Sequence, residues 1–333
     1  MVIGEKRSIV IVGAGQLGSR YLQGLAAVSH HLRVQVVDPS IDALERAAIR
    51  WSEVDGPEVG HEVSYHGDLC EVASDVGVVV VATTAPVRPA AVEAVAERTN
   101  VATWVLEKVL AQSLDDLQRI VHAVGGDMAW VNTWGRMTPW YQRLRGAEAV
   151  GPVRFWVEGG SWGMACNAIH VLDLIAWWTG EDLVGVDAGG LDADWLPGKR
   201  PGMLEVSGSL VATYSGGTTG VLCAGRSAVD GEPAGKDGPE VLGIDGPGSG
   251  WLIERPFSEI DGVAVATDGT RVRGRIEFQS ERTAPLVDDL LNGRGCGLTD
   301  LATSAEQHRI FLSGLLYRWS GVAGRDLDRL PIT

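Results

Sequence analysis

The segment SIVIVGAGQLGSRYLQGL, residues 8–25, constrains the fold more than any other part of the chain. A run of β-branched residues leads into the pattern G-x-G-x-x-G at residues 13–18, and apolar residues at helical spacing follow it. This order predicts a strand, a tight turn and a helix. A second apolar run, LRVQVVDPS, reaches Asp38, 20 residues after Gly18, so the two segments together predict a βαβ unit.

A turn of this kind can bind the pyrophosphate of a dinucleotide. The first glycine permits the tight turn, the second lets the backbone approach the phosphates, and the third allows the helix to pack on the strand. The N–H groups and the positive dipole end of the following helix face the phosphate charge. The alternative is a glycine turn without a ligand. The cofactor contacts expected in this turn are Gly13, Gly15, Gln16, Leu17 and Gly18.

Asp38 lies where such folds recognise the ribose of the nucleotide. Its carboxylate can accept hydrogen bonds from both ribose hydroxyls, whereas a 2′-phosphate would meet like charge. We therefore expect NAD rather than NADP as the cofactor, although Arg20 or Arg33 could reverse this preference by pairing with a 2′-phosphate.

Strand and helix patterns alternate through the first part of the chain. Fully apolar runs such as VGVVVVA, residues 76–82, are separated by helical segments, which predicts a doubly wound parallel sheet. After Gly151 the strands are short and separated by Gly or Asp turns, which predicts an open, largely antiparallel sheet. The expected fold is α/β, with a Rossmann domain at residues 1–126 and a substrate-binding α+β domain at residues 127–333. A C-terminal helix at about residues 299–320 can pack back on the first domain.

Composition and charge limit the class of protein. The 333 residues are 45% hydrophobic and 21% charged, which is typical of a globular protein with a sizeable core. The formal net charge of −15 repels polyanions, so we expect neither nucleic acid nor an anionic membrane as a partner. No apolar run reaches the roughly 20 residues that span a bilayer, and the N-terminus lacks signal-peptide features, so we expect a cytoplasmic protein. The cysteines form no CxxC pair and the histidines show no ligand spacing, so we expect no metal site.

Lysine is rare in this chain, and one of the four lysines stands at a position suited to catalysis. The segment VLEKVL places Glu107 and Lys108 at the C-terminal end of a predicted parallel strand, where open α/β sheets bind ligands. Burying an ammonium group costs several kcal/mol unless it is paired or deprotonated. Lys108 is therefore a candidate acid–base group. The alternative is a side chain that reaches the surface along its apolar stem.

The segment EGGSWGMACNAIHVLDLIAWWTG combines an apolar helix with a row of polar side chains. Cys166, His170 and Asp173 are spaced at i, i+4 and i+7, which places them near one helical face, and Asn167 follows Cys166. We expect these residues to line a substrate site, with Trp162 offering a ring face on which a sugar can stack. The alternatives are polar groups with partners in the core, a Cys166 that packs as a small hydrophobic residue, and an Asp173 that orients His170 or a backbone amide.

These segments, taken in order, resemble the Gfo/Idh/MocA oxidoreductases, which include glucose-fructose oxidoreductase and inositol dehydrogenases, over nearly the whole chain. ATTAPVRPA, residues 82–90, is similar to the A-T-P-N loop of that family, and Glu107-Lys108 is similar to its E-K-P motif. RMTPWYQRL, residues 136–144, resembles its R-F-x-P helix start, and residues 159–173 resemble its G-G-G…D-x-G-x-H-x-x-D segment. The resemblance implies the same two-domain fold.

The resemblance also implies roles for individual residues. Lys108 and His170 take the positions of the catalytic Lys and His, and Asp173 takes that of the second Asp. The chain departs from the family at Cys166, which stands in place of the first Asp, and at Val109, which replaces the Pro of E-K-P.

The loop after the third apolar strand adds further cofactor contacts. Arg88 stands where the family often carries His. The contacts that the resemblance implies outside the glycine turn are Thr83, Thr84, Arg88, Glu107 and Lys108.

The activity that the resemblance implies is the NAD-dependent interconversion of a secondary alcohol and a ketone on a sugar. In that reaction Lys108 takes the hydroxyl proton, and His170 hydrogen-bonds the same oxygen or relays the proton. The W-G-x-A-C-N-A-I-H pattern and Arg136, a candidate clamp for a phosphate or carboxylate, favour a nucleotide-activated sugar of a glycan or antibiotic-sugar pathway. A surface or interdomain ion pair is the alternative role of Arg136.

Two other functions fit the same residues. An NAD-dependent epimerase or glycosidase would borrow a hydride and return it to the same sugar, and a non-catalytic regulator would bind NAD or sugar on the same scaffold. The open sheet of the second domain predicts a homodimer or homotetramer. The sequence leaves open the sugar, the carbon that reacts and the direction of the reaction.

Overall fold

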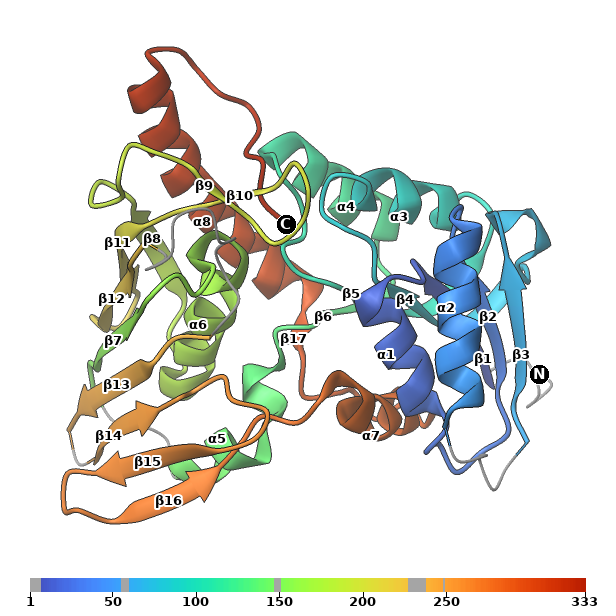
Figure 1. The fold of residues 1–333 in the computed structure, drawn as a ribbon, viewed down its shortest axis with the longest axis horizontal. Coiled ribbons are helices and arrows are strands. Elements are labelled where there is room, and N and C mark those ends of the chain that lie inside the picture. Colours follow the sequence, from blue (N-terminus) through green and yellow to red (C-terminus); the bar gives the residue numbers. More distant parts are fainter. Residues whose placement is uncertain (1–6, 55–59, 147–150, 227–237, 248) are drawn as a thin grey trace. The chain divides into compact units, whose positions relative to one another are not determined.

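The computed structural model describes residues 7–54, 60–146, 151–226, 238–247 and 249–333. The chain divides into two compact units, whose elements are labelled in Figure 1. The first unit consists of Met1–Ala111, Asp115–Asn132 and Glu277–Ala302, and the second of Gln112–Leu114, Thr133–Ile276 and Thr303–Thr333. These units differ from a division between residues 126 and 127, because residues 127–132 and 277–302 belong to the first unit and residues 112–114 belong to the second. The residues from 303 onward group with the second unit.

The first unit is built on a seven-stranded sheet in the order β17-β6-β5-β4-β1-β2-β3. Six of its strands run parallel and β17 runs antiparallel to β6. The strands are β1 (Ser8–Val12), β2 (Arg33–Val37), β3 (Glu62–His66), β4 (Asp75–Val81), β5 (Asn100–Leu106), β6 (Met128–Val131) and β17 (Thr299–Asp300). The predicted parallel sheet is confirmed.

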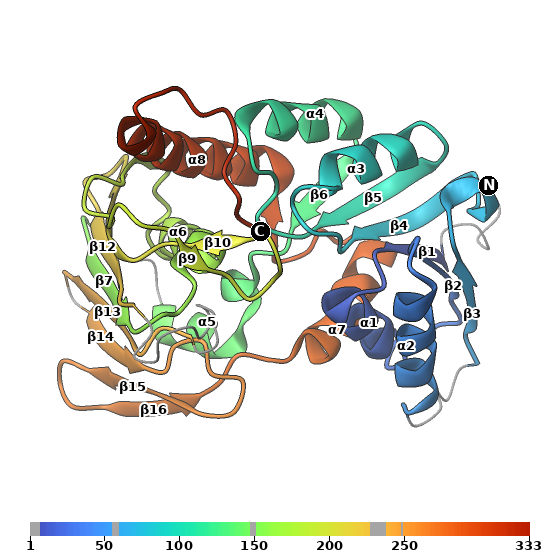
Figure 2. The same ribbon diagram turned by 45° about the horizontal axis from the view of Figure 1, so that its top comes forward.

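Helices cover both faces of this sheet. The helices α3 (Arg88–Ala96) and α4 (Leu114–Val124) lie on one face, and α1 (Gln16–Leu25), α2 (Ile41–Ser52) and α7 (Gln279–Leu291) lie on the other (Figure 2). The central strands are accordingly apolar on both sides, and every residue of β1 is buried. Because β1 lies between β4 and β2, the strand order reverses at β1, which is where sheets of this type bind ligands beyond the carboxyl ends of the strands.

The second unit is built on an eight-stranded sheet in the order β16-β15-β14-β13-β7-β12-β11-β8. All neighbouring strands in it are antiparallel except β12 and β7. The strands are β7 (Arg154–Gly159), β8 (Leu183–Asp187), β11 (Gly208–Tyr214), β12 (Thr219–Ala224), β13 (Val241–Gly246), β14 (Ser249–Glu254), β15 (Gly262–Ala266) and β16 (Arg271–Gly274). The predicted open, largely antiparallel sheet is confirmed.

In the described residues, the second unit also contains helices and a small ribbon, and all of α8 but its first two residues belongs to it. The helices are η3 (Trp134–Met137), α5 (Pro139–Arg145), α6 (Met164–Thr179) and α8 (Leu301–Ala323), and the ribbon pairs β9 (Leu196–Pro197) with β10 (Leu204–Glu205). Twelve of the 16 residues of α6 are buried, as expected for a helix that is apolar on nearly all sides. It begins after Gly163 and ends at Gly180, and both glycines have the positive φ that favours glycine.

Strands β11 and β12 contact the α6 segment through two specific hydrogen bonds. The Tyr214 hydroxyl donates to the carbonyl oxygen of Leu172 at 3.0 Å, and the indole Nε1 of Trp162 donates to that of Cys223 at 2.8 Å. These bonds satisfy the polar ends of two aromatic side chains inside the core.

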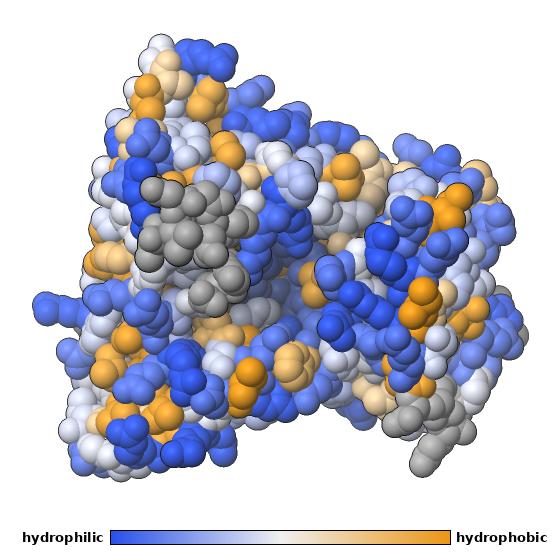
Figure 3. Space-filling model, in the orientation of Figure 1, coloured by the Kyte–Doolittle hydropathy of each residue, from blue (hydrophilic) through white to orange (hydrophobic). Residues whose placement is uncertain are grey.

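The surface carries few large apolar areas on the face shown in Figure 3, where hydrophilic residues dominate and hydrophobic ones are scattered among them. Among the described residues, no helix combines the length and apolar composition needed to cross a bilayer.

Candidate functional site

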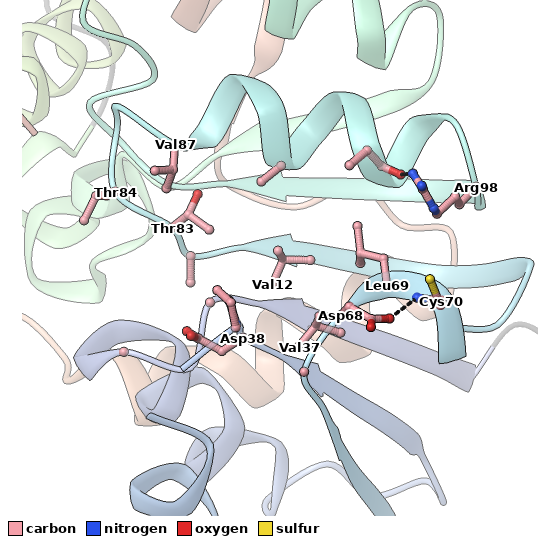
Figure 4. A pocket seen from close by; sticks show the side chains of 17 residues that line it. Val12, Val37, Asp38, Asp68, Leu69, Cys70, Thr83, Thr84, Val87 and Arg98 are labelled. Atoms are coloured by element: carbon pink, nitrogen blue, oxygen red, sulfur yellow. Dashed lines mark hydrogen bonds between the residues drawn. The ribbon is translucent and has the colours of Figure 1, made fainter. Parts of the chain in front are cut away.

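A cavity of about 580 Å³ opens in the first unit beyond the carboxyl ends of β1, β2 and β4 (Figure 4). The β1–α1 turn and the end of β2 form one wall, and the segment after β4 with α3 forms another. The lining residues are Val12, Gly13, Gly15, Val37, Asp38, Pro39, Gly67, Asp68, Leu69, Cys70, Ala82, Thr83, Thr84, Val87, Ala91, Ala94 and Arg98. This is the position at which the strand order predicts a nucleotide site.

The glycine turn has the geometry that pyrophosphate binding needs. Gly13 has a φ of +98°, and its N–H donates to the carbonyl oxygen of Val37 at 2.8 Å. A Cβ on Gly18 would lie 1.8 Å from the carbonyl oxygen of Gly13, so only glycine lets α1 pack this closely. A Cβ on Gly15 would meet nothing within 4 Å, which leaves room for a ligand against the backbone.

The N-terminus of α1 is available to an anion. Gly15 is its N-cap residue, and no described side chain caps the helix there. The N–H groups of its first turn, from Gln16 to Gly18, therefore lack intrahelical partners. The side chains of Gln16 and Leu17 do not line the cavity, and the carbonyl oxygen of the Gln16 side chain accepts from Arg50 at 2.7 Å. Any cofactor contact of these two residues would come from the backbone.

The carboxylate of Asp38 is fixed at the cavity wall by two backbone donors. Its Oδ2 accepts from the N–H of Ala14 at 2.7 Å, and its Oδ1 accepts from the N–H of Ser40 at 2.8 Å. Each carboxylate oxygen has a second lone pair, so Asp38 can still accept ribose hydroxyls. The two arginines that could receive a 2′-phosphate bind elsewhere: Arg20 contacts Gln23 and Arg33 contacts Glu62.

Thr83 and Thr84 line the opposite wall (Figure 4). The hydroxyl of Thr83 is buried and has no hydrogen-bond partner among the described residues. A buried hydroxyl of this kind is expected to bond a ligand or a water molecule. Both threonines therefore lie where the sequence predicts cofactor contacts.

Glu107 does not line this cavity, and its contact with the cofactor stays a prediction. Its carboxylate is buried and accepts from the Tyr21 hydroxyl and from the Asn132 side-chain amide, each at 2.7 Å. Asn132 also donates to Gln279 at 2.9 Å. Burial, and then the nearby Glu107, raise the pKa of Tyr21 well above its usual value. The four residues form a polar network that joins α1, β5, β6 and α7.

The side chain of Arg88 is also buried and hydrogen-bonded within the first unit. It is 1% exposed and does not line the cavity. Its guanidinium donates to the carbonyl oxygens of Thr83, Val109 and Leu110. The guanidinium of Arg88 is thus bonded to backbone carbonyl oxygens, and its contact with the cofactor stays a prediction. Lys108 is half-buried between Glu107 and Val109, at the carboxyl end of β5.

In the second unit, His170 lies among aromatic rings. Its imidazole centroid is 4.9 Å from that of Trp134 and 6.4 Å from that of Phe257, and these two rings meet edge to face at 5.1 Å. His170 is 5% exposed. Trp134 and Phe257 were not among the predicted site residues. Trp134 begins η3, three residues after the end of β6, and no motif in the sequence singled it out.

Asp173 and Arg136 form an ion pair, with the Nη2 of Arg136 2.7 Å from Oδ1 of Asp173. Asp173 is fully buried and Arg136 is largely so. Arg136 thus forms an ion pair, but the pair is buried within the second unit, whereas the alternative to an anion clamp was a surface or interdomain pair. The carboxylate of Asp173 thus accepts from the guanidinium of Arg136, and its proposed role in orienting His170 or a backbone amide stays a prediction.

The start of α6 is held by contacts that include two predicted substrate residues. Asn167 donates to the carbonyl oxygen of Trp162 at 3.0 Å, and Cys166 is half-buried. Trp162 is completely buried, which does not fit the expected stacking of a sugar on its ring. The buried carboxylate of Glu205 accepts from the N–H of Ala165 at 2.8 Å, and sequence patterns gave no sign of this contact.

The far end of the cavity holds residues that motif spacing did not single out. The carboxylate of Asp68 accepts from the N–H of Cys70 at 2.7 Å, and this bond lowers the pKa of Asp68. Asp68 therefore adds a second negative charge to the wall that carries Asp38, while Leu69 and Arg98 close the far end (Figure 4). Its signal in the sequence is a Gly-Asp pair directly after β3. Among the described residues, no group of three His, Cys, Asp or Glu could hold a metal ion.

Solved structures share the fold of this chain at low sequence identity. No family model and no curated protein matches the sequence, whereas solved structures do. An oxidoreductase from Agrobacterium radiobacter, crystallised with NAD+, L-tartaric acid and magnesium, superposes with a TM-score of 0.67 at 14% identity, over 97% of this chain and 98% of that chain. UDP-N-acetylglucosamine 3-dehydrogenase from Acidithiobacillus ferrooxidans gives 0.66 at 17% identity, over 95% and 99%. The transcriptional regulator Gal80p from Kluyveromyces lactis gives 0.66 at 12% identity, over 98% and 95%.

The chain shares their fold. The two-domain fold that the Gfo/Idh/MocA resemblance implies is thus confirmed. At this level of identity the roles of individual residues do not follow from the superposition, and one of the three proteins is a regulator. The shared fold therefore does not fix the chemistry, which depends on the side chains of this chain.

Proposed function

We propose that the protein is an NAD-dependent oxidoreductase that interconverts a secondary alcohol and a ketone on a sugar or polyol. The observation that carries this proposal is the cavity at the strand-order reversal, where an uncapped helix N-terminus lies beside the fixed Asp38 carboxylate. Lys108 lies just beyond the carboxyl end of β5, which is the neighbour of β4 in the same sheet. Two of the solved structures that share the fold are an oxidoreductase and a dehydrogenase.

The cavity residues fit NAD better than NADP. Asp38 and Asp68 place two carboxylates on the wall, and a 2′-phosphate would be repelled by both. No arginine is placed at Asp38 to offset this charge in the described lining, where Arg98 is the one cation. Two observations support a ligand that spans the cavity. The buried Thr83 hydroxyl has no hydrogen-bond partner in the described part of the chain, and the turn at Gly15, on the other wall, leaves open space.

The chemical step needs a hydride acceptor and a proton acceptor. A bound nicotinamide would supply the first by taking the hydride from the carbinol carbon. The amine of Lys108 would take the hydroxyl proton, so that the C–O bond becomes a carbonyl. A cationic nicotinamide held beside Lys108 would favour the neutral amine, which can act as the base. His170 is proposed to hydrogen-bond the reacting oxygen or to relay the proton, as the resemblance implies.

The finer proposal is a nucleotide-activated sugar of a glycan or antibiotic-sugar pathway. It is supported by the pattern around Cys166 and by a structural neighbour that is a UDP-N-acetylglucosamine 3-dehydrogenase. Arg136 supports it less than expected, because its guanidinium is engaged by Asp173. Free sugars and inositols therefore belong in the same substrate panel.

A regulator is the second candidate, because a transcriptional regulator shares the fold and Cys166 replaces a family carboxylate. An epimerase or glycosidase that recycles its hydride is the third. Titration of the purified protein with NAD and NADP, followed by a panel of nucleotide sugars, free sugars and inositols, separates them. Net NADH formation supports the dehydrogenase. Substrate turnover without net NADH supports recycling, and ligand binding without turnover of any substrate supports the regulator.

The second sheet offers a surface on which two copies can associate. One face of this sheet carries a row of residues that lie opposite one another on successive strands. The row consists of Val211, Val221, Trp156, Gly243 and Leu252. Val211 and Val221 are each 39% exposed and Leu252 is 41% exposed. We propose a homodimer or homotetramer through this row. Light scattering should show an oligomer that Val221→Glu dissociates, and a monomeric wild type would contradict the proposal.

A further inference from the structure

Arg88 connects two loops of the first unit. It is the first residue of α3, and its guanidinium is buried. One of its nitrogens donates to the carbonyl oxygen of Thr83, in the segment after β4 that lines the cavity. Another donates to the carbonyl oxygens of Val109 and Leu110, the latter at 3.1 Å. These two residues directly follow Lys108.

Only a guanidinium suits this position. Its planar fork carries five donors that can reach acceptors in different directions, and it stays charged at every physiological pH. The carbonyl dipoles that surround it offset part of the cost of burying the charge. A lysine ammonium is a compact point charge on a flexible stem, so it cannot bridge the same set of carbonyls.

The chain on the other side of Lys108 is held by a separate set of contacts. The carboxylate of Glu107 is fixed by Tyr21 and Asn132, and Asn132 is in turn bonded to Gln279. Lys108 therefore lies between a residue held through its side chain and two residues held through their carbonyl oxygens. Removing either set would free one side of the loop.

We propose that Arg88 is a positioning residue, which fixes the Lys108 amine relative to the cavity wall at Thr83 by bridging the two loops. The use of that amine in catalysis rests on the proposed function, whereas its position does not. The bridge between backbone carbonyls, and not the positive charge alone, is what Arg88 contributes.

The test measures how readily the Lys108 amine reacts with an amine-selective reagent, here formaldehyde with a borohydride reductant. The chain has only four lysines, at positions 6, 108, 199 and 236, so peptide mass spectrometry resolves each site. Exposed Lys199 serves as the internal reference. Arg88→Gln and Arg88→Lys are compared with wild type, and Arg46→Gln, on the exposed side of α2, is the matched control. Circular dichroism verifies that each variant is folded.

The expected result is a several-fold faster modification of Lys108, relative to Lys199, in both Arg88 variants, because the loop opens locally once its carbonyl contacts are lost. Arg46→Gln should keep the wild-type ratio. A wild-type ratio in folded Arg88→Gln overturns the proposal, and so does a wild-type ratio in Arg88→Lys, which would mean that charge alone suffices. Loss of fold in both variants would also overturn it, since Arg88 would then serve the whole unit.

The measurement needs neither cofactor nor substrate. A protein that turns over no compound of the substrate panel would count against the proposed function and would leave the labelling result unchanged. Conversely, the wild type could be active while its Arg88 variants show the wild-type rate of Lys108 modification and wild-type turnover. That result would keep the proposed function and contradict the positioning role.

Discussion

Arg136 and Asp173 pair at two points inside the second unit: Nη2 lies 2.7 Å from Oδ1, and Nε lies 3.2 Å from Oδ2. The side chain of Asp173 is fully buried and that of Arg136 is 19% exposed. Asp173 stands one turn after His170 on α6, so the pair ties η3 to the part of α6 that carries His170. Removing one partner of a buried pair leaves a charge without compensation.

Arg136→Gln should therefore lower the free energy of unfolding by about 3 kcal/mol, because the buried Asp173 carboxylate loses its cation. Urea unfolding followed by circular dichroism measures the change. The double variant Arg136→Gln with Asp173→Asn should regain much of the loss, since both charges are then absent. Arg143→Gln on the exposed side of α5 is the control and should change stability by less than about 0.5 kcal/mol. An equally small effect of Arg136→Gln would contradict the inferred role of the pair.

Asp38→Asn should weaken NAD binding about tenfold or more, because a hydrogen bond to a charged group contributes about 1.5–3 kcal/mol. NADP binding should weaken less or improve, since one of the two carboxylates that repel the 2′-phosphate is removed. Calorimetric titration with both dinucleotides gives the two affinities. Asp42→Asn, an exposed acid in the first turn of α2, is the control. An unchanged ratio of the two affinities would show that Asp38 does not select the cofactor.

Two glycine variants separate folding from ligand binding. Gly18→Ala should lower stability by about 1–3 kcal/mol, because its Cβ would collide with the backbone of Gly13. Gly15→Ala meets no atom and should fold nearly as well as wild type, yet its methyl group would occupy space that the pyrophosphate needs. Thermal unfolding and NAD titration of both variants test this contrast. NAD binding by Gly15→Ala at wild-type strength would argue against a dinucleotide at this turn.

Buried tyrosines set the alkaline limit of stability. Burial raises the pKa of Tyr21, Tyr141 and Tyr214, whereas Tyr317 is 86% exposed. In the unfolded chain the hydroxyls of the three buried tyrosines lose their protons near pH ~10, while the folded chain retains them. The unfolded state therefore binds fewer protons above about pH 10, so stability is unaffected below that pH and falls as the pH rises through it.

Ultraviolet titration of tyrosinate tests this expectation. Tyr21, Tyr141 and Tyr214 should stay protonated in the folded protein beyond pH ~10 and ionise together with unfolding. Tyr214→Phe should reduce the alkaline loss of stability, and Tyr317→Phe should leave it unchanged. Ionisation of all these tyrosines in the folded protein near pH ~10 would contradict the burial described above.

Local patterns were enough to predict the sheets, the glycine turn and Asp38. Gly13, Gly15, Gly18 and Asp38 are diagnostic because the turn, the helix start and the end of the next strand follow one another closely in the sequence. Hydrophobic runs likewise distinguished a parallel sheet buried on both faces from an antiparallel one.

Contacts between distant residues could not be predicted in this way. The bonds of Arg88 to Val109 and of Glu107 to Asn132 depend on which loops the sheet order brings together, and no spacing in the chain encodes them. The burial of Trp162, which was predicted as a stacking residue, could not be predicted for a related reason. Whether an aromatic ring faces a ligand or the core is decided by the strands that pack on it, in this case through Cys223.

Lys108 is the proposed proton acceptor of an NAD-dependent alcohol oxidation. The most direct measurement follows NADH formation by wild type and Lys108→Ala with the first active compound of the substrate panel, after NAD binding by both proteins has been verified. Loss of a general base typically lowers turnover about 10²–10⁴-fold, and we expect a loss of this size with NAD affinity largely retained. Turnover by Lys108→Ala within a few-fold of wild type would contradict the account.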